Sequence, residues 1–197
     1  VIIMKASFFK RISAYIIDYI IIMLALVAIT ASMNINNDVS DKINDLTNQY
    51  RSGDITIDEY SEKIIPLNYE LSKRKLPANI ATVVVFIGYY VVFAYFNKGQ
   101  TFGKKICKIK VVNNDGDKPS IWNMLVRSLF IYGIITSLYS IVTINFLSMN
   151  DFSYSVSVIS IIECMFIVIT VLMMLYKKDG RGLHDIIAKT NVIGEER

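Results

Sequence analysis

The chain has 197 residues, of which 53% are hydrophobic and only 19% are charged, and its mean hydropathy is +0.43. Soluble domains of this size carry about a quarter charged residues, so the composition excludes an ordinary soluble domain and predicts a membrane protein. The net charge of +4 is small and scattered along the chain, which argues against a protein that binds nucleic acid.

Four apolar segments are long enough to cross about 30 Å of hydrocarbon as helices. They cover residues 12–33, 77–96, 121–147 and 155–176. The first resembles a secretory signal peptide, but it is longer than the apolar region of such a peptide and contains Asp18, so we expect a retained helix. The last two are separated only by residues 148–154 and must be antiparallel neighbours. The sequence therefore predicts an all-α polytopic membrane protein with four transmembrane helices in the lipid bilayer.

Residues 34–76 form the one sizeable stretch outside these segments, and their pattern is helical. Apolar residues recur at helical spacing up to a break at residues 52–54, and Thr56 and Glu59 then have the spacing of a capping box. Pro66 is expected to bend or divide the second helix. We interpret this stretch as a small helical hairpin outside the membrane; the alternative is a docking surface for a protein partner.

The loop over residues 97–120 begins with Gly99-Gln100-Thr101-Phe102-Gly103 and then interleaves apolar residues with lysines. The lysines are Lys104, Lys105, Lys108 and Lys110. This pattern predicts a segment at the membrane surface, with its lysines facing lipid phosphates. The turn signal at Asp115-Gly116 predicts a short β-hairpin there.

The distribution of lysine and arginine predicts the orientation. These residues are frequent before the first segment, in the 97–120 loop and after residue 176, whereas residues 148–154 contain none. The 34–76 stretch has six basic residues, but eight acidic residues accompany them. The positive-inside rule then places both termini in the cytoplasm and the hairpin on the outer side.

Ionisable residues within the apolar segments are the main functional candidates, because such residues are costly in a bilayer. Asp18 lies in the first segment, two helical turns after Arg11 and on the same face. Arg127, in the third segment, has a similar depth and is the predicted ion-pair partner of Asp18. Glu163, in the fourth segment, lies deeper and has no obvious cationic neighbour. The pattern is compatible with an ion or proton relay, with charge pairs that only fix helix packing, and with a site for another ligand.

The tail after residue 176 contains Gly180 and Gly182, which should end the fourth helix and turn the chain back. Asp185 then begins a short apolar stretch, which we expect to return to the bundle near Arg11. Together, Asp18 and Asp185 are predicted to form with Arg11 and Arg127 a polar cluster at the cytoplasmic end of the bundle.

Sequence motifs of enzymes are missing from the chain. It has no nucleophile-elbow, zinc-helix, P-loop or CxxC motif. His184 is the only histidine, and Cys107 and Cys164 have no metal-binding spacing. We therefore expect no enzymatic activity, no metal site and no cofactor.

Several motifs, in order, resemble the RDD family of bacterial membrane proteins, which is named for one arginine and two aspartates. The likeness rests on Lys10 to Asp18, on Gly99 to Lys105 with Val111-Val112, on Arg127, and on Leu183 to Thr190. By this match Arg11, Asp18 and Asp185 are the family's R, D and D. The resemblance covers almost the whole chain, residues 1–197, as a single domain, and the 34–76 hairpin looks like an insertion in it.

The resemblance implies a multi-helix protein of the bacterial plasma membrane, and some relatives are thought to transport ions or small solutes, including by sodium–proton antiport. It assigns no role to Glu163. The leading hypothesis is therefore a transporter, which we expect to be a homo-oligomer because four helices are few for a complete pathway. The alternative is a membrane scaffold or accessory subunit that presents the 34–76 hairpin to a partner.

Overall fold

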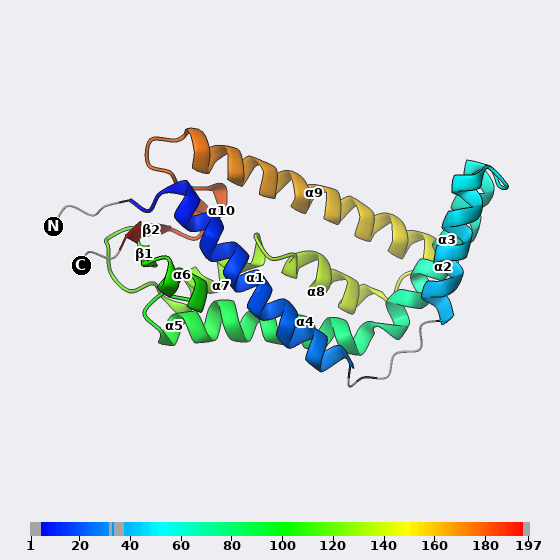
Figure 1. The fold of residues 1–197 in the computed structure, drawn as a ribbon, viewed down its shortest axis with the longest axis horizontal. Coiled ribbons are helices and arrows are strands. Elements are labelled where there is room, and N and C mark those ends of the chain that lie inside the picture. The colour runs from blue at the N-terminus through cyan, green and yellow to red at the C-terminus, as the bar shows by residue number, and fades with distance from the viewer. Residues whose placement is uncertain (1–4, 32, 34–37, 195–197) are drawn as a thin grey trace.

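The computed structural model describes residues 5–31, 33 and 38–194, and these form an elongated helical bundle with a small sheet at one end (Figure 1). In chain order the elements are α1 (Phe8–Ala31), α2 (Asp38–Ser52), α3 (Ile57–Arg74), α4 (Leu76–Ile87), the π-helical η1 (Gly88–Phe93), α5 (Ala94–Phe96), α6 (Phe102–Ile106), β1 (Ile109–Asn113), α7 (Ile121–Leu129), α8 (Ile134–Thr143), α9 (Met149–Tyr176), α10 (Leu183–Ile187) and β2 (Thr190–Gly194).

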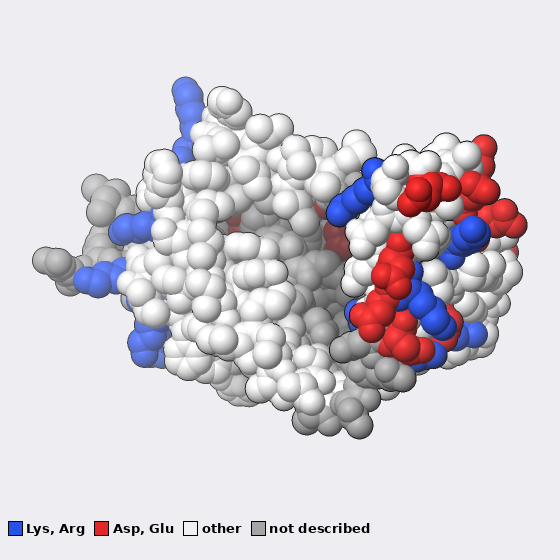
Figure 2. Space-filling model, turned by 45° about the vertical axis from the view of Figure 1, so that its right-hand side comes forward, with Lys and Arg blue, Asp and Glu red and all other residues white. Residues whose placement is uncertain are grey.

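Three of the four predicted membrane segments are helices long and apolar enough to cross a bilayer. They are α1, the run Leu76–Phe96 made of α4, η1 and α5, and α9. Their outward side chains are apolar and exposed, with Leu24 at 68% and Ile161 at 61%, as expected for contact with lipid. In Figure 2 this uncharged surface forms a band between two charged ends of the molecule. The prediction of an all-α membrane protein is confirmed.

The third predicted segment is not one helix. It consists of α7 and α8, which are bent by 79° relative to each other at residues 130–133. Gly133 begins α8 in a left-handed conformation, with φ of 69°, which a continuous α-helix does not accommodate. The prediction of an unbroken span over residues 121–147 is therefore wrong, and the described residues contain three helices that could cross a membrane or, if the bent pair counts as one span, four.

The predicted 148–154 loop is also shorter than expected. The hydroxyl of Ser148 accepts a hydrogen bond from the backbone N–H of Asp151 and caps α9, so most of this stretch is helical. α8 and α9 pack against each other and run in opposite directions (Figure 1), as the short connection predicts.

The sheet joins distant parts of the chain. β1 pairs antiparallel with β2, from Ile109 opposite Gly194 to Asn113 opposite Thr190. The predicted β-hairpin at Asp115-Gly116 is therefore wrong: after this turn the chain enters α7, and β1 pairs with the tail instead. The backbone N–H of Ala6 also bonds to the β2 carbonyl of Val192 at 3.1 Å.

The predicted helical hairpin is formed by α2 and α3, which pack together at the end of the bundle opposite the sheet (Figure 1). The capping box is present, because the Thr56 N–H donates to the Glu59 carboxylate at 2.8 Å and the Glu59 N–H donates to the Thr56 hydroxyl at 3.2 Å. These bonds lower the pKa of Glu59. Pro66 lies inside α3, which is continuous, so the prediction that it could divide this helix is wrong. Residues 34–37 of the predicted stretch lie outside the described residues.

Candidate functional site

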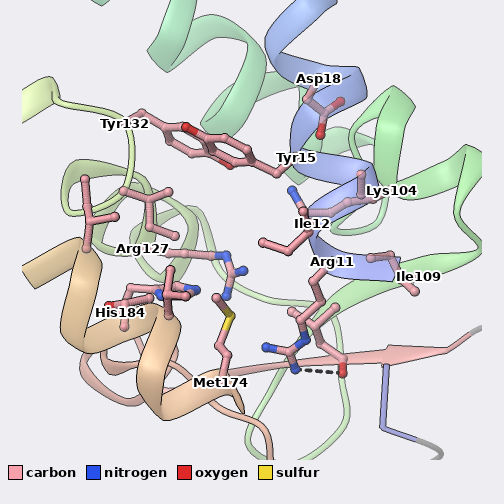
Figure 3. A pocket seen from close by; sticks show the side chains of 16 residues that line it. Arg11, Ile12, Tyr15, Asp18, Lys104, Ile109, Arg127, Tyr132, Met174 and His184 are labelled. Atoms are coloured by element: carbon pink, nitrogen blue, oxygen red, sulfur yellow. Dashed lines mark hydrogen bonds between the residues drawn. The ribbon is translucent and has the colours of Figure 1, made fainter. Parts of the chain in front are cut away.

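A cavity of about 180 Å³ lies at the sheet end of the bundle. Side chains from α1, α6, α7, α9, α10 and the strands surround it (Figure 3). Most of its wall is apolar, but five ionisable residues also line it: Arg11, Asp18, Lys104, Arg127 and His184. The helices around this cavity thus bring together most of the residues that the sequence singled out.

Asp185 forms ion pairs with both arginines of the cavity wall, Arg11 and Arg127, although it does not line the cavity itself. Its carboxylate is fully buried, accepts a hydrogen bond from Arg11 Nη1 at 2.9 Å, and is in close contact with Arg127 Nη1. The backbone N–H of Gly182 donates to the same carboxylate at 3.2 Å. Arg11 also donates to the β2 carbonyl of Val192. One carboxylate therefore connects α1, α7 and the tail, and the predicted return of the tail to Arg11 is confirmed.

Asp18 has different partners from those predicted. Its Oδ2 accepts a hydrogen bond from the Thr101 hydroxyl at 2.5 Å, and its Oδ1 accepts from the Tyr89 hydroxyl at 2.6 Å and from the Gly103 N–H at 2.8 Å. The predicted pair between Asp18 and Arg127 is wrong, because neutral donors occupy both oxygens of Asp18 while Arg127 pairs with Asp185. The predicted polar cluster therefore consists of two separate groups beside one cavity. One joins Asp185 to Arg11 and Arg127, and the other joins Asp18 to Tyr89, Thr101 and Gly103.

A close approach of α6 to α1 makes the Asp18 group possible. A Cβ atom on Gly103 would lie 2.9 Å from the Asp18 carboxyl group and would overlap the backbone carbonyl of Ala14. The glycine of the Thr101-Phe102-Gly103 motif is therefore needed for contact between the helices.

The π-helical segment η1 supplies aromatic residues that contact Asp18 and the cavity-lining Tyr132. π-Helical turns within α-helices are rare and frequent at functional sites. Within η1, Tyr89 bonds Asp18, while the ring of Tyr90 stacks on that of Tyr132 with centroids 3.6 Å apart. Tyr132, in the break between α7 and α8, also stacks on Tyr15 at 5.9 Å. The rings of Tyr15 and Tyr132 line the cavity (Figure 3), and Tyr90 of η1 packs against Tyr132.

Lys104 is buried and points into the cavity (Figure 3). Its predicted place at the membrane surface is therefore wrong, because the face of α6 that carries Gly103 and Lys104 packs toward α1. Burial, followed by the positive charge of Arg127, lowers the pKa of Lys104 to about 8. Its ammonium donates to the Thr101 hydroxyl at 3.3 Å, and no carboxylate of the described residues forms an ion pair with it. Lys105 and Lys108 are exposed and Lys110 is half-buried, and their contact with lipid stays a prediction.

His184 and Thr170 add buried polar groups without hydrogen-bond partners. Neither ring nitrogen of His184 has one, although Nε2 lies 3.3 Å from Asp185 Oδ1, and the Thr170 hydroxyl also lacks one. Burial, and then the charges of Arg127 and Arg11, hold the pKa of His184 well below 6.5. The imidazole is therefore neutral, so its contact with Asp185 is not an ion pair.

Residues 5–189 match the RDD family. This chain belongs to the RDD family. No curated protein and no solved structure matches it.

The three residues that the sequence resemblance assigns as R, D and D, namely Arg11, Asp18 and Asp185, make two different sets of contacts in this structure. Arg11 and Asp185 form the ion pair that connects α1 to the tail. Asp18 instead binds the segment that carries Thr101 and Gly103. The motifs by which the chain resembles the RDD family thus surround one cavity.

Glu163, which lies outside the RDD motifs, does not line the cavity. It is buried in α9, where its Oε2 accepts a hydrogen bond from the Thr136 hydroxyl of α8 at 2.5 Å, while its Oε1 has no partner. It therefore connects two neighbouring helices, and its role in a relay stays a prediction. Within residues 5–31, 33 and 38–194, no three His, Cys, Asp or Glu side chains are grouped as metal ligands would be.

The sequence analysis missed four neutral residues that contact Asp18 or line the cavity: Tyr89, Thr101, Thr170 and His184. Thr101 and His184 stand inside the matched motifs and could have been selected on that ground. Tyr89 and Thr170 are single residues in apolar helices and carry no local signal of their contacts.

Proposed function

We propose that this protein transports ions or small solutes across a bacterial plasma membrane and that its cavity is the binding site. The observation that carries the proposal is the broken span. The break residues Ile131 and Tyr132 line the same cavity as Asp18, Lys104 and Arg127. Non-helical backbone is tolerated at membrane depth where it lines a cavity, and interrupted helices form the binding sites of many transporters.

The orientation that we propose places the sheet end, with both termini, in the cytoplasm. The described part of that end carries exposed basic residues from three chain segments, among them Lys10, Lys105 and Lys178, and the opposite end carries the hairpin with its acidic residues (Figure 2). The cavity then lies on the cytoplasmic side. Transport would require the stacked rings of Tyr15, Tyr90 and Tyr132 to separate, and we propose that a homo-oligomer completes the pathway.

Two forms of transport are open to this site. In cation–proton exchange, Asp18 or Glu163 would carry the ion, but Asp18 already accepts three hydrogen bonds, so that a cation would have to displace a donor. In solute transport, the cavity binds a molecule beside Arg11 and Lys104. The surplus of cations over carboxylates around the cavity favours the solute.

Flux in proteoliposomes tests the proposal. Proton flux is followed after sodium and potassium pulses across a pH gradient, and solute uptake is measured in parallel, for the native protein, Asp18→Asn and Glu163→Gln. Asp179→Asn changes an exposed carboxylate and is the matched control. Flux that is lost in Asp18→Asn but kept in the control would support the cavity as the binding site, whereas flux that is lost only in Glu163→Gln would support transport by a route outside the cavity and contradict this assignment. Folded protein with neither flux above that of empty liposomes would contradict it.

A scaffold is the second candidate, and the hairpin favours it. An ion pair connects α2 to α3, since Arg74 Nη1 of α3 lies 2.5 Å from Asp38 Oδ1 of α2, and Arg74 also pairs with Glu70 within α3 at 2.6 Å. The hairpin also projects from the bundle with a charged surface (Figure 2). Neither candidate function requires catalysis. Deletion of residues 38–73 separates the two, because a transporter would keep its flux whereas a scaffold would lose a partner captured by the full chain.

A further inference from the structure

The buried charges around the cavity do not balance. Three side chains carry positive charge, Arg11, Lys104 and Arg127, and two carry negative charge, Asp18 and Asp185, while His184 is neutral. All are buried. A buried charge without a counter-charge is costly, so this site is complementary to a monoanion.

Three residues that line the cavity have buried polar atoms without hydrogen-bond partners. Arg11 Nε, both nitrogens of His184 and the Thr170 hydroxyl are buried without hydrogen-bond partners, and all three side chains line the cavity. Most buried polar atoms in proteins are bonded, so several such atoms in one cavity indicate a missing partner. A carboxylate accepts strong hydrogen bonds from guanidinium, ammonium and imidazole N–H groups.

The remaining wall of the cavity is suited to a ligand whose part beyond the carboxylate is apolar. Tyr15 and Tyr132 present aromatic rings, and Ile131, Ile167 and Met174 add aliphatic surface. The volume of about 180 Å³ is close to the roughly 150 Å³ of a protein cavity known to hold benzene. The space therefore suits a body of about one aromatic ring.

We propose that the cavity binds a small monocarboxylate with an apolar body, its carboxylate beside Arg11, Lys104 and His184 and its body against Tyr132. This inference rests on the proposed function for its biological meaning, because it names the class of solute transported. Binding itself is a property of the site and can be measured without transport.

Calorimetric titration of the full chain in detergent micelles tests the proposal with three ligands of similar size. Benzoate carries the anion, benzamide is neutral, and benzylamine is cationic. We expect saturable binding of benzoate to the protein beyond that of protein-free micelles, and none of the other two. Equal binding of benzamide and benzoate, or no binding of benzoate, would overturn the proposal. Binding of palmitate without benzoate would indicate a lipid site and would also overturn it.

Matched variants locate the binding site. Lys104→Met should weaken benzoate binding about tenfold or more, the usual effect of losing a bond to a charged group, whereas Lys105→Met, on the exposed face of α6, should leave it unchanged. Thr170→Val should weaken binding without lowering thermal stability, a combination that a purely structural hydroxyl would not produce. Unchanged affinity in both Lys104→Met and Thr170→Val would refute the assignment, whether or not either variant is less stable.

The flux assay separates the two proposals. Benzoate binding without uptake or cation flux would support the monocarboxylate site and contradict the proposed transport function. Cation flux without benzoate binding would support the proposed transport function and overturn the proposal that the cavity binds a monocarboxylate.

Discussion

Replacing Asp185 by asparagine tests the connection between α1, α7 and the tail. The change keeps the shape of the side chain but removes the charge shared by Arg11 and Arg127. Hydrogen bonds to charged groups contribute about 1.5–3 kcal/mol each, and breaking a buried ion pair costs about 3–5 kcal/mol. Because Asp185 is fully buried and two guanidinium groups lose their partner together, we expect the free energy of unfolding to fall by about 3–5 kcal/mol.

Reversible unfolding by SDS, titrated into a mild detergent and followed by circular dichroism, measures this loss. Asp115→Asn is the control, because Asp115 is exposed and such surface changes stay within about 0.5 kcal/mol. If Asp185→Asn loses less than about 1 kcal/mol, or no more than the control, then other acceptors or water satisfy the two arginines and the reasoning fails.

Three further predictions concern the neighbouring contacts. Gly103→Ala should destabilise the fold by about 1–3 kcal/mol, because the added methyl overlaps the backbone of α1, whereas Gly88→Ala, with no atom within 4 Å of the added Cβ, should be neutral or slightly stabilising in the same unfolding titration. Tyr89→Phe should cost about 1.5–3 kcal/mol, because Asp18 loses a short hydrogen bond; a loss no larger than that of Tyr95→Phe would show that this bond contributes little. Because burial lowers the pKa of Lys104 from 10.5 to about 8, the folded protein binds fewer protons than the unfolded chain between these pH values, so stability should rise from pH 8 toward 10.5 and benzoate affinity should fall as the pH passes 8. Other charged or titratable residues line the same cavity: Arg11, Asp18, Arg127 and His184. The contribution of Lys104 is therefore found by measuring the stability and the benzoate affinity of Lys104→Met at each pH. An unchanged pH dependence in that variant would contradict the prediction.

The spans, the hairpin and its capping box could be predicted because local patterns determine them. Apolar length predicts a membrane helix, and the spacing of Thr56 and Glu59 predicts a helix start. The break at Gly133 could not be predicted in the same way. A single glycine in an apolar run is usually tolerated within a helix, and the stacking of its neighbour Tyr132 on Tyr90, 42 residues earlier, leaves no local signal in the sequence.

The pairing of the site residues was predicted only in part. Arg11 and Asp185 were expected to meet because the glycines of the tail turn the chain back. The partners of Asp18 were not found, since charge matching selects Arg127 whereas the structure uses the neutral groups of Tyr89 and Thr101. Hydroxyl groups bond carboxylates well but leave no mark in a charge pattern. The pairing of β1 with β2 was missed because the third and fourth apolar segments separate the two strands in the sequence, and local sequence patterns do not indicate pairing over such a distance.

The ion pair between Arg11 and Asp185 has a consequence for how the protein is made. The two residues are 174 positions apart, and at about 5–20 residues per second the ribosome needs roughly 10–35 s to produce the second after the first. Throughout that interval α1 is already synthesised, while its arginine has no carboxylate from the tail. A chain released after α9 lacks Asp185 and β2 altogether. Only a finished polypeptide can close the cavity, so an interrupted product would present two unpaired arginines to the proteases that survey the membrane.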